Sequence, residues 1–348
     1  MLTKPDISDD SIIARLRESF GLRITQVTFL PLGYVNSAVY RVAADTGISY
    51  FLKLRRGDVN PVAVALPAFL HAQGIRQVMA PIATTSGTLW ARAQGFAWIL
   101  YPFFAGKTGF DAALSKTHWI ALGQSLNALH TTVLPADLAA RVPREAYSPR
   151  WRERVKLFHQ QVEQERFADP IAARFTAFWL TQRDEIRRMV ARAEQLARAL
   201  WQRAADFVVC HADLHGRNVL VRADDELAIV DWDEPILAPK ERDLMFIGGG
   251  VGGIWNSEED ARWFYQGYGQ TEIDLVALSY YRYERILVDI AEDAELIFGM
   301  HGSVDDRLKA LQWSNQFLPN NVVDIAHRTY HRLTESARGS SFRRGEST

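Results

Sequence analysis

The 348-residue sequence predicts an α+β protein of two lobes, a β-rich N-terminal lobe that includes a helix and a mainly helical C-terminal lobe. Short runs rich in β-branched and aromatic residues fill most of residues 1–102. Helical periodicity then dominates, and three strand-like runs interrupt it between residues 206 and 232. We therefore place the lobes at residues 1–102 and 103–334, and we expect the polar, Gly/Ser-rich residues 335–348 to form a disordered tail.

The elements of the first lobe follow from local patterns. Four apolar residues at helical spacing predict a helix over residues 11–20, which Gly21 ends. A short helix is expected directly after Pro67, and residues 78–103 are expected to add two strands around a turn at Ser86-Gly87. Three earlier strands are expected at residues 24–33, 36–44 and 48–54.

The second lobe alternates long helical runs with one group of strands. Apolar residues recur at helical spacing, with many charged residues on the opposite face. The predicted helical runs are residues 116–133, 151–203 and 258–333. The predicted strands are residues 206–210, 218–223 and 226–232, with a turn at Asp224-Asp225 between the last two.

Composition excludes several classes of protein. The 40 basic and 41 acidic residues leave a net charge of -1, so no global attraction draws the chain to nucleic acid or to an anionic membrane. The single cysteine, Cys210, cannot form an intramolecular disulfide, and at the end of an apolar strand we expect it to be buried. No apolar run is long enough for a membrane span. We expect a cytoplasmic protein without an obligate protein partner.

The stretch that carries chemistry is His211-Ala-Asp213-Leu-His215-Gly-Arg-Asn218, followed by Asp231 in VDWD. Phosphoryl transfer needs a carboxylate that orients the attacking hydroxyl, and it needs oxygen ligands for Mg²⁺. Asp213 suits the first role, and Asn218 with Asp231 suits the second. Both motifs follow or flank predicted strands, where loops expose functional side chains.

Other interpretations of this stretch remain open. His211 and Asp213 could form only a buried polar turn. Alternatively, His211, Asp213 and His215 could be the metal ligands of a hydrolase. However, two histidines at i, i+4 share a face only on a helix, and Gly216 with the preceding apolar strand favours a loop.

Lys53 is a charged residue in the otherwise apolar strand ISYFLKL, where it could neutralise nucleotide phosphates. A solvated strand lysine is the alternative. Gly33, at a strand turn upstream, together with the downstream Asp/Asn/Asp set, favours the phosphate role.

The motifs CHADLHGRNVLV and IVDWDEP resemble the paired signatures of the aminoglycoside phosphotransferases, which have a protein-kinase-like fold. A closer similarity to the spectinomycin 9-phosphotransferases of that family lies in three longer blocks. These blocks are YSPRWRE (residues 147–153), DWDEPILAPKERDLMFIGGGVG (231–252) and SYYRYERILVDIA (279–291). The resemblance covers nearly the whole chain except the tail.

The resemblance implies a role for individual residues. Asp213 would be the catalytic carboxylate, Asn218 and Asp231 the metal ligands, and Lys53 the phosphate-binding lysine of the N-terminal, nucleotide-binding lobe. His211 and Asp243 would support the catalytic loop. The implied cofactors are ATP and Mg²⁺, with adenine contacting the main chain of the lobe connector through the Tyr101 carbonyl and the Phe103 amide.

Two departures from the family pattern concern the nucleotide. The loop LGYVNSAVYRV lacks a full G-x-G-x-x-G, so Gly33, Asn36 and Ser37 are the candidates to approach phosphate. The first-lobe helix contains no carboxylate to pair with Lys53, and Asp58 is the nearest candidate partner.

The implied substrate is spectinomycin, a cationic aminocyclitol, phosphorylated at its 9-hydroxyl. Carboxylates should then line its site. The alternatives are a kinase for another metabolite of the choline, homoserine or methylthioribose type, a kinase for protein hydroxyls, or a nucleotide-binding pseudoenzyme. The candidate substrate contacts are Trp232, Glu234, Glu284, Asp289 and Glu292.

Overall fold

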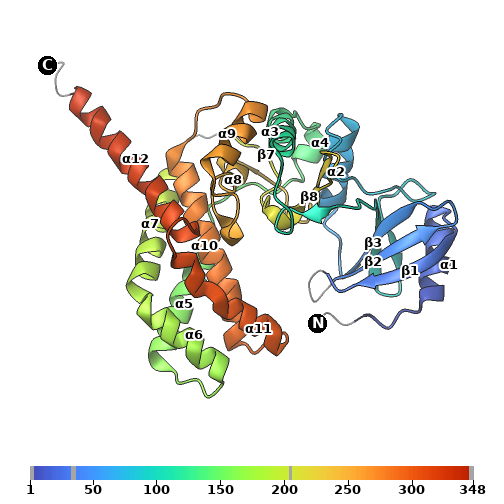
Figure 1. The fold of residues 1–348 in the computed structure, drawn as a ribbon, viewed down its shortest axis with the longest axis horizontal. Coiled ribbons are helices and arrows are strands. Elements are labelled where there is room, and N and C mark those ends of the chain that lie inside the picture. The colour runs from blue at the N-terminus through green and yellow to red at the C-terminus, as the bar shows by residue number, and fades with distance from the viewer. Residues whose placement is uncertain (1–3, 33–36, 204–205, 345–348) are drawn as a thin grey trace. The chain divides into compact units, whose positions relative to one another are not determined.

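The computed structural model describes residues 4–32, 37–203 and 206–344, which form two compact units (Figure 1). The first unit comprises Met1–Pro143 and Gly216–Pro235, and the second comprises Arg144–His215 and Ile236–Thr348. These units divide the chain differently from the predicted lobes. Residues 103–143 join the first unit because β6 (Lys107–Thr108) pairs with β8 (Val219–Val221) there.

The first unit is built on a five-stranded antiparallel sheet, and its three earlier strands confirm the prediction. The helix α1 (Asp9–Phe20) packs on this sheet, beginning at the Ser8 cap and ending at Gly21, whose φ is 68°. The strands, in spatial order, are β1 (Ile24–Leu30), β2 (Ser37–Ala44), β3 (Ser49–Arg56), β5 (Phe96–Pro102) and β4 (Ala91–Ala93).

The side chains of the central strand β3 alternate between the hydrophobic core and the opposite face of the sheet. Successive side chains of a strand point to opposite faces. Leu52 and Leu54 are fully buried in the hydrophobic core beneath α1. Lys53 and Arg55 therefore project from the opposite face, where the chemistry described below is found.

Two details of the first unit correct the predictions. The helix α2 (Val62–Ala72) begins before Pro67, because the Asn60 side chain accepts a hydrogen bond from the Val62 amide and caps its first turn. The hairpin turn between the last two strands lies at Gln94-Gly95 and not at Ser86-Gly87. Both Gln94 (φ 52°) and Gly95 (φ 77°) are left-handed, as a tight hairpin turn requires.

A smaller antiparallel sheet, ordered β6-β8-β9, completes the first unit. The strand β9 (Leu227–Ile229) also forms a parallel bridge from Ile229 to Val78. The turn joining β8 to β9 contains Asp225 at φ 64°. The remaining elements are α3 (Lys116–Thr131), α4 (Ala136–Ala139) and η1 (Gly216–Asn218).

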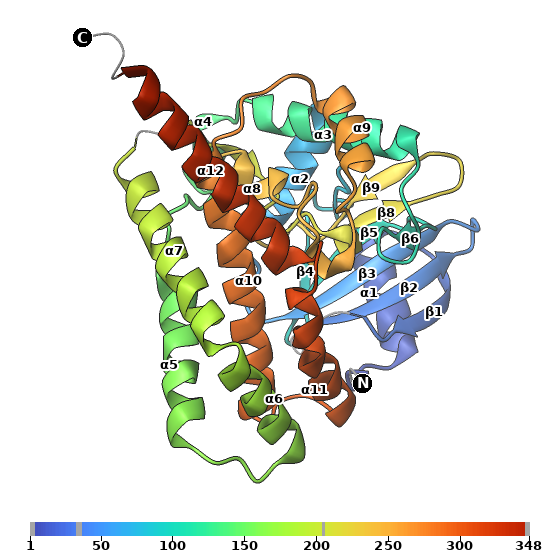
Figure 2. The same ribbon diagram turned by 60° about the vertical axis from the view of Figure 1, so that its left-hand side comes forward.

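The second unit surrounds the long helix α10 (Leu275–Phe298), against which α5, α7 and α12 pack (Figure 2). A two-stranded sheet of β7 (Val208–Cys210) and β10 (Ile236–Ala238) lies in the same unit. The other helices are α5 (Arg150–Gln164), α6 (Pro170–Thr181), α7 (Arg183–Trp201), α8 (Glu241–Leu244), η2 (Val251–Gly253), α9 (Glu258–Tyr268), α11 (Val304–Ala310), η3 (Leu311–Phe317) and α12 (Val322–Arg344).

The end of the chain differs from its prediction. The helix α12 continues through residues 335–344, where composition predicts disorder, because each residue added to an existing helix gains a backbone hydrogen bond. Residues 345–348 lie outside the described part, so the prediction stands untested for them. Over the described ranges, every helix is too short or too polar to cross a bilayer.

The geometry of the Gln94-Gly95 turn predicts how substitutions at Gly95 change the stability of the fold. Gly95→Ala should lower the free energy of unfolding by about 1–2 kcal/mol, because a Cβ is disfavoured at positive φ. Gly95→Asn is the matched control and should cost less, since asparagine tolerates the left-handed region. Thermal denaturation of both variants checks this, and equal stability of Gly95→Ala and wild type would contradict the turn geometry.

Candidate active site

Lys53 lies at the centre of a charged cluster in the first unit. Its Nζ lies 3.0 Å from Asp231 Oδ1 and 2.9 Å from both oxygens of Asp233. Arg55, two residues along the same face of β3, lies 3.2 Å from Asp233. Burial alone would lower the pKa of Lys53, but Asp231 and Asp233 raise it, so the lysine is held as a cation.

Asp58, the expected partner of Lys53, has a different role. It is an exposed residue whose carboxylate pairs with Arg92 at 2.9 Å. It precedes α2 in sequence, whereas Asp231 and Asp233 follow β9 and reach Lys53 only through the tertiary fold. That prediction is therefore wrong.

The β8–β9 hairpin brings the two predicted metal ligands together. Val219 pairs with Ile229, so Asn218 and Val230 are opposite each other, and the Val230 amide donates to the Asn218 carbonyl at 2.9 Å. Asp231 is the next residue and adopts φ 64°, which a short polar side chain tolerates. Asn218 and Asp231 thus belong to the same end of the hairpin, and the Asp231 carboxylate lies next to Lys53. This donor set of hard oxygens fits Mg²⁺.

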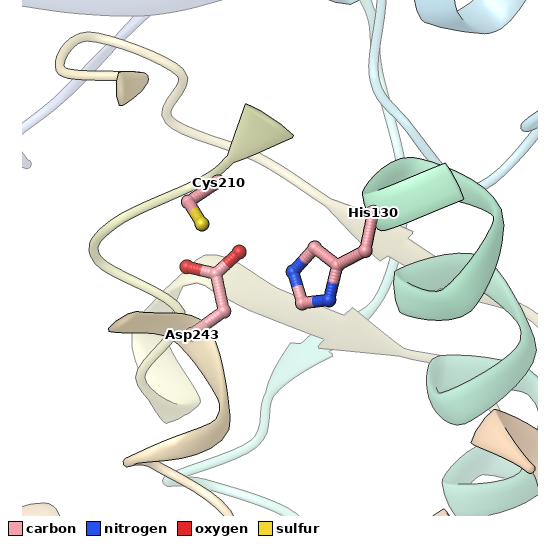
Figure 3. A group of neighbouring side chains, drawn as sticks. All are labelled: His130, Cys210 and Asp243. Carbon is pink, nitrogen blue, oxygen red and sulfur yellow. The ribbon is translucent and has the colours of Figure 1, made fainter. Parts of the chain in front are cut away.

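A buried carboxylate in the second unit holds the start of the loop that follows β7, residues 211–215. Asp243, on α8, is fully buried and accepts the His211 amide through Oδ2 (2.8 Å) and the Ala212 amide through Oδ1 (2.7 Å). Figure 3 shows its side chain beside Cys210 at the end of β7. Burial, then Asp243, raises the pKa of the Cys210 thiol, which is therefore a packed and unreactive group.

His211 also serves this loop. It is buried, and its Nδ1 accepts the Asp213 amide at 3.3 Å. That nitrogen is directed at its own loop, which disfavours the alternative of a His211/Asp213/His215 metal site. Between the two residues, Ala212 has φ 73°, so the loop makes a sharp left-handed step immediately before Asp213.

Asp213 is held by two donors of the second unit. Arg285, on α10, lies 2.7 Å from its Oδ1, and His215 Nε2 lies 3.2 Å from its Oδ2. Burial raises the pKa of Asp213, but the His215 contact and the Arg285 charge outweigh it and hold that pKa well below its usual range. An ionised, oriented carboxylate can accept a hydrogen bond from a hydroxyl.

The backbone groups predicted to contact adenine lie at the end of β5 and directly after it. The Phe103 amide donates to the Ser49 carbonyl at 3.3 Å, within the β3–β5 pairing, and the Tyr101 carbonyl points to the same side by strand alternation. On the other side of β5, the Leu100 carbonyl accepts the Ile82 amide at 2.7 Å. The Phe103 amide is thus already paired with β3, and only the alternate positions of this segment face away from β3.

The other nucleotide candidates divide into two groups. Ser37 opens β2 and pairs with Arg55 across the β2–β3 ladder, at the end of the sheet that carries the Lys53 cluster. Burial, then Asp233 and Asp231, raises the pKa of the Tyr101 hydroxyl, which marks that side chain as close to the same carboxylates. Gly33 and Asn36 lie outside the described residues.

Two predicted substrate contacts are corrected. Glu284 is buried and pairs with Arg152, which also donates to Tyr280 (3.2 Å) and to the Tyr147 carbonyl (2.9 Å). It faces the packed interior between α10 and α5, where an unpaired carboxylate would be costly. Trp232 is also buried, and its indole N–H donates to the Ile229 carbonyl at 3.2 Å. Both residues are structural.

The remaining substrate candidates are accessible to different extents. Glu234 and Glu292 are exposed. Asp289 is partly buried, and its Oδ1 lies 2.9 Å from Arg285 Nε. Asp289 therefore belongs to the network around Asp213.

Sequence reasoning missed three residues of the two clusters, Asp233, Arg55 and Arg285, and also missed the pairing of His215 with Asp213. For the first two a signal existed, because each lies two residues from a predicted site residue on a strand-like segment and so shares its face. No local pattern identifies Arg285, which lies 72 residues from Asp213.

Asp243 makes a prediction about stability. Asp243→Asn leaves one acceptor oxygen for two buried amides, so it should lower the free energy of unfolding by about 1–3 kcal/mol. Asp206→Asn, at an exposed position before β7, should change it by less than about 0.5 kcal/mol. Chemical denaturation compares the two, and equal effects would show that the Asp243 contacts add no stability.

Comparisons with known proteins identify the family and the fold. The model of the phosphotransferase enzyme family matches residues 26–272. Spectinomycin phosphotransferase APH(9)-Ia in complex with ADP and spectinomycin is similar, with 36% identity and a TM-score of 0.88 over 94% of this chain and 99% of that chain. An AMP-bound structure of the same enzyme matches with a TM-score of 0.83 and 36% identity, over 92% of this chain and 98% of that one.

A more distant structure shares the fold. An aminoglycoside phosphotransferase from Alicyclobacillus acidocaldarius matches with a TM-score of 0.63 at 15% identity, over 94% of this chain and 98% of that chain. A comparison with curated proteins finds no significant match. The predicted protein-kinase-like fold class is confirmed. The family match spans well over half of the sequence, and the chain therefore belongs to the phosphotransferase enzyme family.

Proposed function

We propose that this protein is an ATP- and Mg²⁺-dependent O-phosphotransferase that modifies the 9-hydroxyl of spectinomycin. The observation that carries the proposal is the similarity, at 36% identity over 94% of the chain, to a phosphotransferase bound to ADP and spectinomycin. The charged clusters around Lys53 and Asp213 supply the residue types that the reaction needs.

The nucleotide phosphates require positive charge. ATP carries about four negative charges, and Lys53 and Arg55 present two cations on one face of β3. In the absence of nucleotide, Asp231 and Asp233 neutralise these cations. Phosphate would take over part of that role, and Ser37 at the end of the same sheet is a candidate hydrogen-bond donor to it.

Asn218 and Asp231 would hold the metal. Bound Mg²⁺ would neutralise phosphate charge and fix the transferred group in line. Asp233 is a further carboxylate within reach of the same lysine, so it is the third candidate for the metal site. The lysine's own position beside both carboxylates supports a cation-binding role for this end of the hairpin.

Adenine recognition would use the alternate backbone groups of the connector. The Pro102 carbonyl points away from β3 by strand alternation, and an extended chain would direct the Phe104 amide to the same side. These two groups replace the Tyr101 carbonyl and the Phe103 amide as the acceptor and donor for the base.

Asp213 would orient the acceptor hydroxyl. Its lowered pKa makes it a weak base, so its contribution is to hold the nucleophile and to accept the proton late, as the oxygen bonds to phosphorus. Glu234 and Glu292, both exposed, are the carboxylates left to meet the cationic amines of the drug.

The deciding experiment is a phosphorylation assay with purified protein, Mg-ATP and spectinomycin, with the product identified by mass spectrometry and NMR. We expect phosphate on the 9-hydroxyl. Asp213→Asn should lower kcat by about 100-fold or more, while the KM for ATP stays nearly unchanged. Unmodified spectinomycin, together with turnover of choline, homoserine, methylthioribose or a protein hydroxyl, would refute the substrate but not the reaction class.

The metal assignment makes a separate prediction. Asp231→Ala should abolish turnover at any practical Mg²⁺ concentration, because it removes the carboxylate ligand and one of the two carboxylates that hold Lys53. Asp224→Ala, in the exposed turn of the same hairpin, is the control and should retain wild-type turnover. Full activity of wild type in excess chelator would contradict metal dependence.

A further inference from the structure

Arg285 joins two carboxylates of the second unit. From α10 its Nη1 donates to Asp213 Oδ1 at 2.7 Å, and its Nε lies 2.9 Å from Asp289 Oδ1, one helical turn further along. Its side chain is 21% exposed, and that of Asp289 is 28% exposed, so the three groups form a partly buried chain of charges. Such a chain is worth more than a solvated surface pair, because less water screens it.

The two donors to Asp213 share a common support. The buried Phe246 ring lies 5.9 Å from the Arg285 guanidinium and 6.4 Å from the His215 ring, both measured to the ring centroid. One side of the loop is thus braced through Arg285 on Oδ1 and the other through His215 on Oδ2. Contacts to both oxygens define the plane of the Asp213 carboxylate. The hydrogen bonds from the loop backbone to Asp243 position the loop but do not define that plane.

The charges around Asp213 also indicate that Arg285 holds its carboxylate. Its own loop presents His211 and His215, and α10 presents Arg285 with Asp289 behind it. Burial would lower the pKa of Arg285, but Asp289 and then Asp213 raise it, with a smaller contribution from Glu292. Burial raises the pKa of Asp289, and Arg285 opposes that rise. Asp289 and Asp213 therefore share the positive charge of Arg285.

We propose that Arg285 is a positioning residue for phosphoryl transfer: it fixes the Asp213 carboxylate, and Asp289 acts through Arg285 without touching the substrate. This inference rests on the proposed function of Asp213. It replaces the expectation that Asp289 binds the drug. A cationic substrate group would have to share the Asp289 carboxylate with the guanidinium that it now neutralises.

A double-mutant cycle separates the two roles of Asp289. Arg285→Gln should lower kcat by about 10- to 100-fold, since misplacing a reacting group by about 1 Å has effects of this size. The KM for spectinomycin should change less than the kcat, and Arg285→Lys should recover part of the rate. Asp289→Asn should also lower kcat, and the Arg285→Gln/Asp289→Asn double variant should stay within about twofold of Arg285→Gln alone.

Arg154→Gln is the matched control, because Arg154 forms a more exposed pair with Glu295 of the same helix α10. It should retain the wild-type kcat. A raised KM for the drug in Asp289→Asn, with unchanged kcat and full additivity in the double variant, would overturn the inference in favour of substrate contact. Wild-type kcat in Arg285→Gln would overturn it altogether.

A second measurement does not need turnover. A ¹³C-NMR titration of the Asp213 carboxylate should show a higher pKa in Arg285→Gln than in wild type, and no change in Arg154→Gln. An unmoved titration would refute the Arg285 contact even if the protein phosphorylated another substrate. Conversely, a wild-type protein inactive on spectinomycin but with the expected titration shift would refute the proposed substrate and retain the positioning role.

Discussion

The interaction on which the site of the second unit depends is the pair of hydrogen bonds that Asp243 accepts from the His211 and Ala212 amides. The loop leaves β7 with a left-handed residue, Ala212, and so cannot satisfy these amides within a regular strand. A fully buried carboxylate supplies both acceptors at once. The position of Asp213, the next residue, follows from this anchor, and its side chain is then free to be oriented by other groups.

In both clusters, cations or hydrogen-bond donors lie beside carboxylates. In the first unit Lys53 and Arg55 face Asp231 and Asp233, and in the second unit Arg285 and His215 face Asp213. A partly buried carboxylate without such a partner would take up a proton more easily and lose its affinity for a cation or a hydroxyl. For Asp213, the His215 contact and the Arg285 charge lower the pKa and keep the carboxylate ionised.

Residue type alone did not distinguish functional from structural acids on α10. Glu284, Asp289 and Glu292 lie within nine residues of one helix, yet the first pairs with Arg152 in the interior, the second pairs with Arg285, and the third is exposed. The three side chains leave the helix in different directions. What each one meets depends on how α5 and the loop that follows β7 pack against α10. The environment of Trp232 also depends on packing, since this residue is buried although its neighbour Asp231 is exposed.

The sequence by itself determined the order of the early strands, the α1 helix with its glycine stop, the catalytic-loop motif and the family to which the chain belongs. These features depend on local periodicity, on turn residues and on residue spacings of less than about 20, which a linear pattern records. Tertiary structure decided the acidic partners of Lys53, the pairing of Arg285 with Asp213 and the interior position of Glu284. Each of these is a contact between residues 72 to 180 positions apart, and electrostatic pairing at that separation depends on how elements pack, which no local pattern encodes.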